Sequence, residues 1–179
     1  VVQNVVVVPG KHVDYVALSY LWGDTIQTRD SDVVGSWWQA LFLEDNGDIR
    51  LQTGKLPRTI RESIELVKRL GRRYLWVDLI CINQSHPKHK SAAVREMHRI
   101  YEGASFTIVA AGGCDADAGL PGLNPGGRAT EFTSTIASGN DMFRLAFARP
   151  SPHDVLSSTR WTKRAWTFQE EILSVICLY

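Results

Sequence analysis

The stretch RWTKRAWTFQEEIL, residues 160–173, gathers the most side chains that could do chemistry. Two tryptophans and two adjacent glutamates lie in it, and a surface helix needs neither tryptophan. Trp166 and Glu170 are four positions apart, so a helix brings them to one face, one turn apart. An aromatic wall and a carboxylate can thereby share one pocket, where the carboxylate could stabilise developing positive charge.

A second carboxylate, Asp78, lies inside the nearly continuous apolar run RYLWVDLICINQ, which is typical of a strand covered on both faces. A buried carboxylate needs either partners or a function. One hypothesis is that Asp78 binds substrate, together with Asn83 at the end of the same run. The alternative is that Asp78 anchors the fold through Arg160 or Arg164, and that Asn83 and Gln84 only satisfy loop backbone groups.

The run YVALSYLWG, residues 15–23, predicts an interior strand that ends in a loop. Open parallel sheets bind ligands in the crevice beyond the carboxyl ends of their strands. The residues at this end are Ser19, Tyr20, Trp22, Gly23 and Asp24. A nucleotide could rest there against Trp22, with its phosphates or ribose on Asp24 and on backbone amides. The alternative is a strand-ending turn in which Trp22 is a lid over the core.

Three other patterns indicate chemistry only weakly. Cys81, His98 and Asp78 could form a thiol hydrolase, but Cys81 is predicted to lie in mid-strand as an inert core thiol. His86 and His89 have no cysteine or acid nearby, so they predict a solvated loop and no metal site. The glycine-rich segment that follows residue 109 lacks the Lys-Ser/Thr pair of a phosphate-binding loop.

Strand and helix patterns alternate along the chain. Strands are predicted at 15–23, 73–84 and 106–113, and amphipathic helices at 56–71 and 91–105. The predicted apolar faces of the two helices are Ile60, Ile64, Val67 and Leu70, and Val94, Met97, Tyr101 and Ala104. Short links between such elements are typical of right-handed crossovers, so we expect a three-layer α/β fold with a mostly parallel central sheet and helices on both faces.

The remaining segments are less regular. Residues 36–43 predict a short helix, and residues 114–159 form an inserted loop region with a hairpin around Gly139-Asn140. Residues 165–179 predict a helix followed by a fourth strand. The whole chain, residues 1–179, is expected to be one domain.

Composition argues against several binding partners and several classes of protein. The 20 Lys and Arg residues nearly balance the 19 Asp and Glu residues, so neither nucleic acid nor a membrane is an expected partner. Three scattered cysteines favour a reducing compartment and predict a cytoplasmic protein. The apolar opening VVQNVVVVPG is too short for a membrane span and lacks the features of a signal peptide. Because the chain does not begin with Met, we expect it to be a piece of a longer multidomain protein.

Four blocks together resemble the fungal heterokaryon-incompatibility (HET) domain, and they occur in that family's order. They are YVALSYLWG, LPRTIRESIELVKRLGRRYLWVDLICINQ, REMHRIYEGASFTIVAAGG and RWTKRAWTFQEEILS. The resemblance runs from about Tyr15 to the end of the chain and leaves residues 24–54 and 114–159 as variable loops. It implies a module of fungal non-self recognition and programmed cell death, a form of innate immunity, usually joined to other domains.

The order of the blocks is also similar to that of Toll/interleukin-1 receptor (TIR) domains, which have a flavodoxin-like sheet and in several groups of organisms cleave NAD. Their first strand ends in Ser-Tyr or Ser-Phe, matched here by Ser19 and Tyr20. A later helix carries Trp-Cys-x-x-Glu with a catalytic glutamate, matched by Trp166 and Glu170, with Thr167 in place of the cysteine. The resemblance implies NAD as a substrate, no bound cofactor, and Glu170 as the charge opposite the cleaving ribose. We expect Trp166 and Trp161 to wall this site. The structural alternative is that Glu170 only caps or solvates the first turn of its helix.

Two functions are therefore expected, and the sequence leaves open whether the chain is an enzyme. The first is a cell-death effector that hydrolyses NAD to nicotinamide and ADP-ribose. The second is a non-catalytic module that oligomerises when a sensor domain, in the same or a partner chain, is triggered. A pocket shared by Glu170, Ser19, Tyr20 and Asp78 would favour catalysis, whereas exposure of Glu170 to bulk solvent would favour assembly.

Overall fold

The centre of the molecule is a four-stranded parallel sheet with the strand order β4-β1-β5-β8. The computed structural model describes residues 13–23, 38–45, 48–124, 133–138, 141–146 and 151–179. The four strands are β1 (Tyr15–Ser19), β4 (Tyr74–Trp76), β5 (Phe106–Val109) and β8 (Cys177–Leu178). β1 is a central strand, because Ala17 pairs with Trp76 on one side and with Thr107 on the other.

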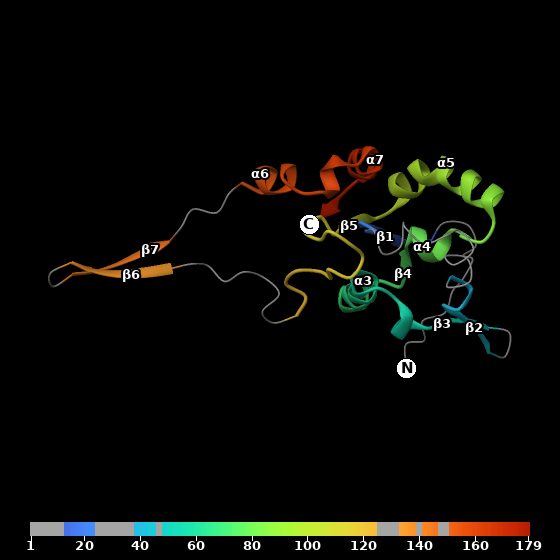
Figure 1. Cartoon of the computed structure of the whole chain (residues 1–179), viewed down its shortest axis with the longest axis horizontal. Helices are drawn as coiled ribbons and strands as arrows, with labels where there is room; N and C mark the ends of the chain where they lie inside the picture. The colour runs from blue at the N-terminus through green and yellow to red at the C-terminus, as the bar shows by residue number, and fades with distance from the viewer. Residues whose placement is uncertain (1–12, 24–37, 46–47, 125–132, 139–140, 147–150) are drawn as a thin grey trace.

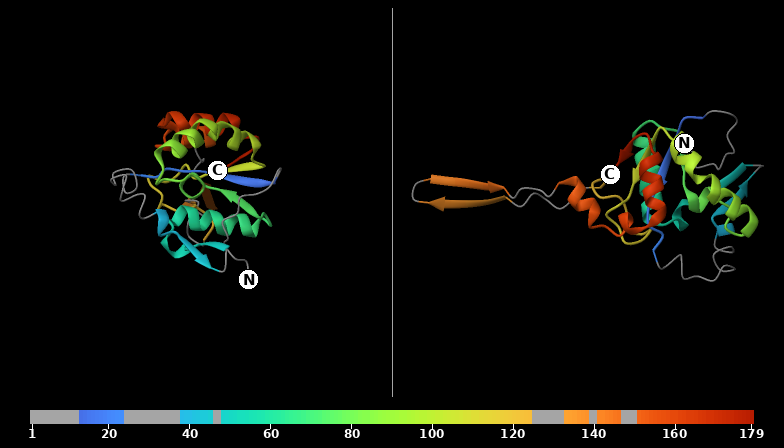
Figure 2. Two further views of the ribbon diagram at one scale, coloured as in Figure 1. Left: turned by 90° about the vertical axis from the view of Figure 1, so that its right-hand side faces the viewer. Right: turned by 90° about the horizontal axis from the view of Figure 1, so that it is seen from above.

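Helices cover both faces of this sheet. They are α3 (Arg58–Arg69), α5 (Pro87–Gly103) and α7 (Ala165–Leu173). The chain moves from β1 to β4 through α3, then turns back to β5 through α5 and continues to β8 through α7. Because parallel crossovers are right-handed, this reversal places α3 on one face and α5 and α7 on the other, as Figures 1 and 2 show. The predicted α/β fold is confirmed.

Helix α3 shows how the apolar pattern specifies packing. Ile60 and Val67 are buried, and Ile64 packs against the same core. The prediction for Leu70 is wrong, because this side chain is 47% exposed. Leu70 is the residue that follows the last turn, and Gly71, at φ +68°, turns the chain away from the helix axis.

Helix α5 begins earlier than the sequence predicts. Its first residue is Pro87, and a ring nitrogen of His86 accepts a hydrogen bond from the backbone N–H of His89 at 3.3 Å. A side chain that caps a helix, followed by proline, is a start signal, so the solvated-loop prediction for His86 and His89 is wrong. Tyr101 and Ala104 are buried as expected, with Met97 packed against them.

The predicted strand at 73–84 is wrong beyond Trp76. β4 ends there, and a single helical turn, α4 (Asp78–Cys81), follows. Leu79 and Ile80 are buried on this turn, whereas Cys81 is exposed and does not lie in mid-strand. Periodicity cannot distinguish a buried strand from a buried helical turn in a short apolar run. Asp78 therefore begins a helical turn just after the carboxyl end of β4.

The smaller elements lie outside the central sheet. β2 (Phe42–Asp45) pairs with β3 (Asp48–Leu51), and η1 (Thr53–Lys55) follows. The predicted helix at 36–43 is wrong at its end, where β2 begins; residues 36–37 lie outside the described residues. The predicted hairpin is confirmed as β6 (Thr133–Ser138) and β7 (Asp141–Ala146), with its tip, 139–140, outside the described residues. Figure 1 shows this hairpin apart from the central sheet.

α6 (Pro152–Ser157) and η2 (Trp161–Lys163) lead into α7.

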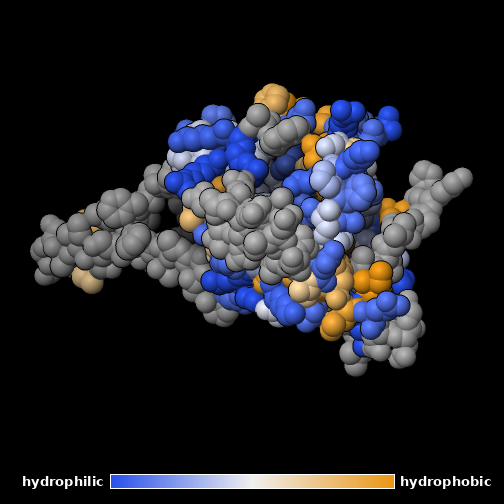
Figure 3. Space-filling model, turned by 45° about the vertical axis from the view of Figure 1, so that its right-hand side comes forward, coloured by the Kyte–Doolittle hydropathy of each residue, from blue (hydrophilic) through white to orange (hydrophobic). Residues whose placement is uncertain are grey.

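Figure 3 shows one face of the molecule, on which hydrophilic residues predominate among those described and hydrophobic residues form small patches. No helix in the described ranges is both long and apolar enough to cross a bilayer.

Candidate functional site

The carboxyl ends of β1, β4 and β5 lie at one edge of the sheet. β4 lies on one side of β1 and β5 on the other, so the chain reverses its direction of travel across the sheet at β1. Open α/β sheets bind ligands outside the strand ends at such a switch point. Ser19 ends β1 there, and Asp78 follows β4 at the same edge.

Glu170 reaches this edge from α7 and meets Ser19. The Ser19 hydroxyl donates a hydrogen bond to Oε2 of Glu170, and Ser19 Oγ accepts one from Nε1 of Trp161 at 2.7 Å. All three side chains are buried, with Glu170 only 9% exposed. Tyr101 of α5 donates to the backbone oxygen of Leu18 at 3.2 Å and also contacts the Glu170 carboxylate. Four elements, β1, η2, α5 and α7, therefore converge on one carboxylate.

The environment of Glu170 favours its neutral form. Burial raises its pKa to about 7, and the negative charge of Asp78 acts in the same direction. The hydrogen bond from Ser19 and the positive charge of Arg164 oppose this rise. Glu170 lies in the second turn of α7 and is buried, so it neither caps nor solvates the first turn.

Asp78 forms the second polar centre of the site. Trp22 Nε1 donates to Asp78 Oδ2 at 2.8 Å, and the backbone N–H of Leu79 donates to Oδ1 at 2.6 Å. Burial raises the pKa of Asp78 to about 6, while these hydrogen bonds and the charge of Arg164 counteract the rise. Of the two arginines that the sequence offered as anchors, Arg164 is the one that acts on Asp78; Arg160 is exposed.

The other predicted site residues have more ordinary positions or are not described. Asp24 lies outside the described residues, and so does the side chain of Trp166, although its backbone belongs to α7. Gly23 has φ +71°, and a Cβ atom there would lie 2.3 Å from Cβ of Asp115. Asn83 Oδ1 accepts from the backbone N–H of Ser85 at 2.9 Å, as in a loop-stabilising turn.

Two residues have roles at this site that the sequence did not predict. Tyr101 reads only as an apolar core residue in the sequence, but its hydroxyl lies against Leu18 and Glu170. Trp161, expected as a wall of the site, also donates a hydrogen bond to Ser19. Thr167 is buried, and its hydroxyl lies 2.6 Å from the backbone oxygen of Trp161 and 2.7 Å from that of Arg164. Thr167 therefore ties η2 to the start of α7, at the position where the TIR pattern has cysteine.

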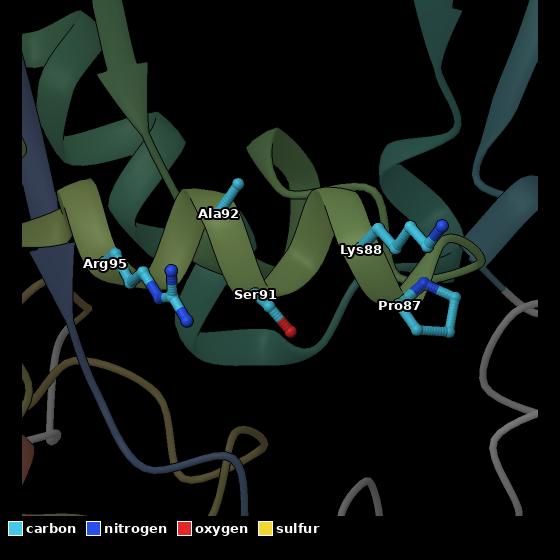
Figure 4. Close-up of a pocket in the computed structure, with 5 residues that line it drawn as sticks. All are labelled: Pro87, Lys88, Ser91, Ala92 and Arg95. Carbon is cyan, nitrogen blue, oxygen red and sulfur yellow. The ribbon is translucent and has the colours of Figure 1, made fainter.

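The structure also has a shallow hollow on the exposed side of α5. Figure 4 shows its lining residues, all from this helix: Pro87, Lys88, Ser91, Ala92 and Arg95. No carboxylate lines this hollow, and its lining includes none of the residues described above around Glu170. Among the described residues, no three His, Cys, Asp or Glu side chains gather as a metal site.

Comparison with known proteins gives two matches. The model of the family described as heterokaryon incompatibility protein (HET) matches residues 15–170. Heterokaryon incompatibility protein 6, OR allele, of Neurospora crassa is 37% identical over 98 residues, which are 53% of this chain. The matched region is 14% of that relative, so the chain spans only a small part of its length. No solved structure matches the chain.

Proposed function

Because the chain belongs to the heterokaryon incompatibility (HET) family, we propose that it acts in fungal heterokaryon incompatibility as a cell-death effector that hydrolyses NAD. The name of the Neurospora crassa relative supports the incompatibility role. The enzymatic part rests on one observation, the buried Glu170 carboxylate beside Ser19 at the switch point of the sheet. Because Glu170 is buried, it lacks the exposure to bulk solvent that would favour assembly.

The proposed chemistry is cleavage of the bond between nicotinamide and ribose. As this bond breaks, positive charge develops on the ribose, and the ionised Glu170 stabilises it. Nicotinamide leaves with the bonding electron pair and becomes neutral, so no strong general acid is needed. Water then attacks the ribose carbon and loses a proton, which gives ADP-ribose. With a pKa of about 7, Glu170 is partly ionised at neutral pH.

The surrounding residues have supporting roles in this proposal. Ser19, held by Trp161, orients the Glu170 carboxylate. Tyr20, Trp22, Gly23 and Asp78 bound the substrate site around the end of β1. Asp24, Asn83 and Trp166 remain proposed substrate contacts. NAD is the substrate here, and the reaction needs no resident cofactor or metal.

A second candidate function is supported by exposed apolar side chains on and after α7. Phe168 is 64% exposed and Ile172 is 61% exposed, and Val175 and Ile176 follow them in the loop before β8. Such side chains are typical of an interaction surface. This function is a non-catalytic module that self-associates in the cytoplasm when a sensor domain triggers it.

The two functions can be separated by assaying the purified chain with NAD, both dilute and artificially clustered. Release of nicotinamide together with ADP-ribose supports hydrolysis. A folded, clustered chain that leaves NAD intact but forms larger particles as its concentration rises supports the assembly function instead.

A further inference from the structure

Two buried polar atoms near the candidate site have no hydrogen-bond partner among the described residues. They are the hydroxyl of Tyr20 and Oε1 of Gln84. Tyr20 is 4% exposed and Gln84 is 8% exposed. Proteins leave few such atoms unpaired, because each loses its hydration without a replacement. At the edge of the sheet where ligands bind, these two atoms are therefore available to pair with a ligand.

Both atoms belong to residues that lie against Asp78. The Tyr20 hydroxyl is close enough to the Asp78 carboxylate to alter its pKa, but it does not reach hydrogen-bond geometry. The Gln84 side chain donates from Nε2 to the backbone oxygens of Ile82, at 3.0 Å, and Asp78, at 3.4 Å. Because the amide nitrogen is committed to these two carbonyls, Oε1 is left as a free acceptor.

The three side chains define the group that would satisfy them. Tyr20 offers one donor, Gln84 one acceptor, and the Asp78 carboxylate has further acceptor capacity beyond the bonds from Trp22 and Leu79. A primary carboxamide has one acceptor oxygen, which can pair with the Tyr20 donor. It also has two N–H donors, which can pair with the acceptors of Gln84 and Asp78. A hydroxyl offers only one donor, and a carboxylate offers none.

We propose that Tyr20, Asp78 and Gln84 form an amide slot, which binds the primary carboxamide group of a ligand. The choice of ligand rests on the proposed function: the amide slot would hold the carboxamide of nicotinamide, and the ribose would be directed toward Glu170. Ser19, which binds Glu170, and Asp78 each lie two residues beyond the paired positions Ala17 and Trp76 of neighbouring strands, so the two carboxylates could serve adjacent parts of one substrate. The cationic nicotinamide ring would also be favoured beside Asp78.

The test compares binding of nicotinamide and nicotinic acid, which differ only in having an amide or a carboxylate. The chain carries Glu170→Gln, which removes the neighbouring carboxyl with a pKa of about 7, and titration calorimetry is done at a pH of about 8, above the Asp78 pKa of about 6. We expect nicotinamide to bind at least about tenfold more tightly than nicotinic acid, because Asp78 and Gln84 present acceptors to the carboxylate.

Two hydroxyl deletions, each added to Glu170→Gln, then test the slot itself. Tyr20→Phe should weaken nicotinamide binding about tenfold and lower Tm less than the control does, because this hydroxyl lies beside Asp78 without hydrogen-bond geometry. Tyr15→Phe is the matched control. Its hydroxyl donates to the backbone oxygen of Ile100 at 2.6 Å, so the change should lower Tm and leave nicotinamide binding intact.

Equal binding of the two ligands, no binding of either, or unchanged affinity in Tyr20→Phe would overturn the slot. A permanently bound water on Tyr20 and Gln84 would produce the last of these results. The slot and the hydrolase can also fail separately. Selective nicotinamide binding without NAD turnover by the unsubstituted chain would support the amide slot and contradict NAD hydrolysis. NAD turnover without selective nicotinamide binding would support hydrolysis and contradict the slot.

Discussion

The hydroxyl of Ser19 donates a hydrogen bond to Oε2 of Glu170 across 151 positions of sequence, joining the end of the central strand to α7. Trp161 donates to the same serine oxygen from η2. The carboxylate is therefore oriented by the end of a strand that is paired on both sides. A preorganised charge of this kind needs no rearrangement when positive charge develops on a substrate.

The raised pKa of Glu170 predicts that the protein is more stable in mild acid than at mildly alkaline pH. The folded protein keeps the Glu170 proton up to about pH 7, whereas the unfolded chain releases it near the ordinary value of 4.5. Because the folded state then binds more protons, the free energy of unfolding falls as pH rises through this interval. Asp78 adds to the fall between 3.8 and about 6.

Urea denaturation at a series of pH values checks this prediction. The Glu170→Gln variant has no carboxyl to titrate at this position, so its free energy of unfolding should decline less between pH 4.5 and about 7. The decline due to Asp78, between pH 3.8 and about 6, should remain. A wild-type free energy of unfolding that climbs across the whole interval would show that Glu170 is not held in its neutral form.

Trp161→Phe tests whether the indole N–H positions Ser19. The substitution removes a buried donor, so we expect a loss of about 1–3 kcal/mol in stability. NAD turnover should fall about tenfold, since Ser19 and Glu170 lose part of their orientation. Trp38→Phe is the control, because it removes a similar bond, from Trp38 Nε1 to the backbone oxygen of Leu79 at 2.8 Å. It should destabilise the chain and leave turnover per folded molecule unchanged; equal effects on turnover would argue against a positioning role.

Gly23→Ala tests the tight packing of the loop after β1. Gly23 and Gly71 both have positive φ, +71° and +68°, so alanine is strained at either position. Only at Gly23 would the new Cβ meet another atom, Cβ of Asp115 at 2.3 Å; nothing lies within 4 Å of the Cβ at Gly71. We expect about 1–2 kcal/mol of destabilisation for Gly71→Ala and at least about 1 kcal/mol more for Gly23→Ala. If urea denaturation showed that both variants lose the same free energy of unfolding, the Asp115 contact would not be tight.

The sequence predicted the parallel sheet because its strands and helices alternate, and α3 because Ile60, Ile64 and Val67 repeat at helical spacing. It failed at 73–84 for a physical reason. Val77, Leu79 and Ile80 are apolar and buried, and their hydrophobicity is compatible with an extended or a helical backbone, so hydrophobicity alone could not locate the end of β4. Asp78, next to that boundary, was the local sign of a helix start.

The candidate site was only partly predictable. Ser19 could be expected at the carboxyl edge of the sheet because it ends a strand, and Glu170 because the TIR-like pattern assigns it to the same site. Asp78 was predicted inside the strand at 73–84, and it lies at this edge because β4 ends at Trp76. The bond from Trp161 to Ser19 and the unpaired atoms of Tyr20 and Gln84 depend on packing between segments far apart in sequence. No pattern of spacing reports such contacts, since they arise only once the elements have docked.

The most direct measurement is nicotinamide release from NAD by the clustered chain carrying either Glu170→Gln or Glu171→Gln. Glu171 is the adjacent glutamate, and its carboxylate accepts a hydrogen bond from the Tyr179 hydroxyl at 2.6 Å. We expect Glu170→Gln to lower nicotinamide release at least about a hundredfold while the variant remains folded, and Glu171→Gln to release nicotinamide at nearly the wild-type rate. Equal rates for both variants, or no release by the folded wild-type chain, would contradict this expectation.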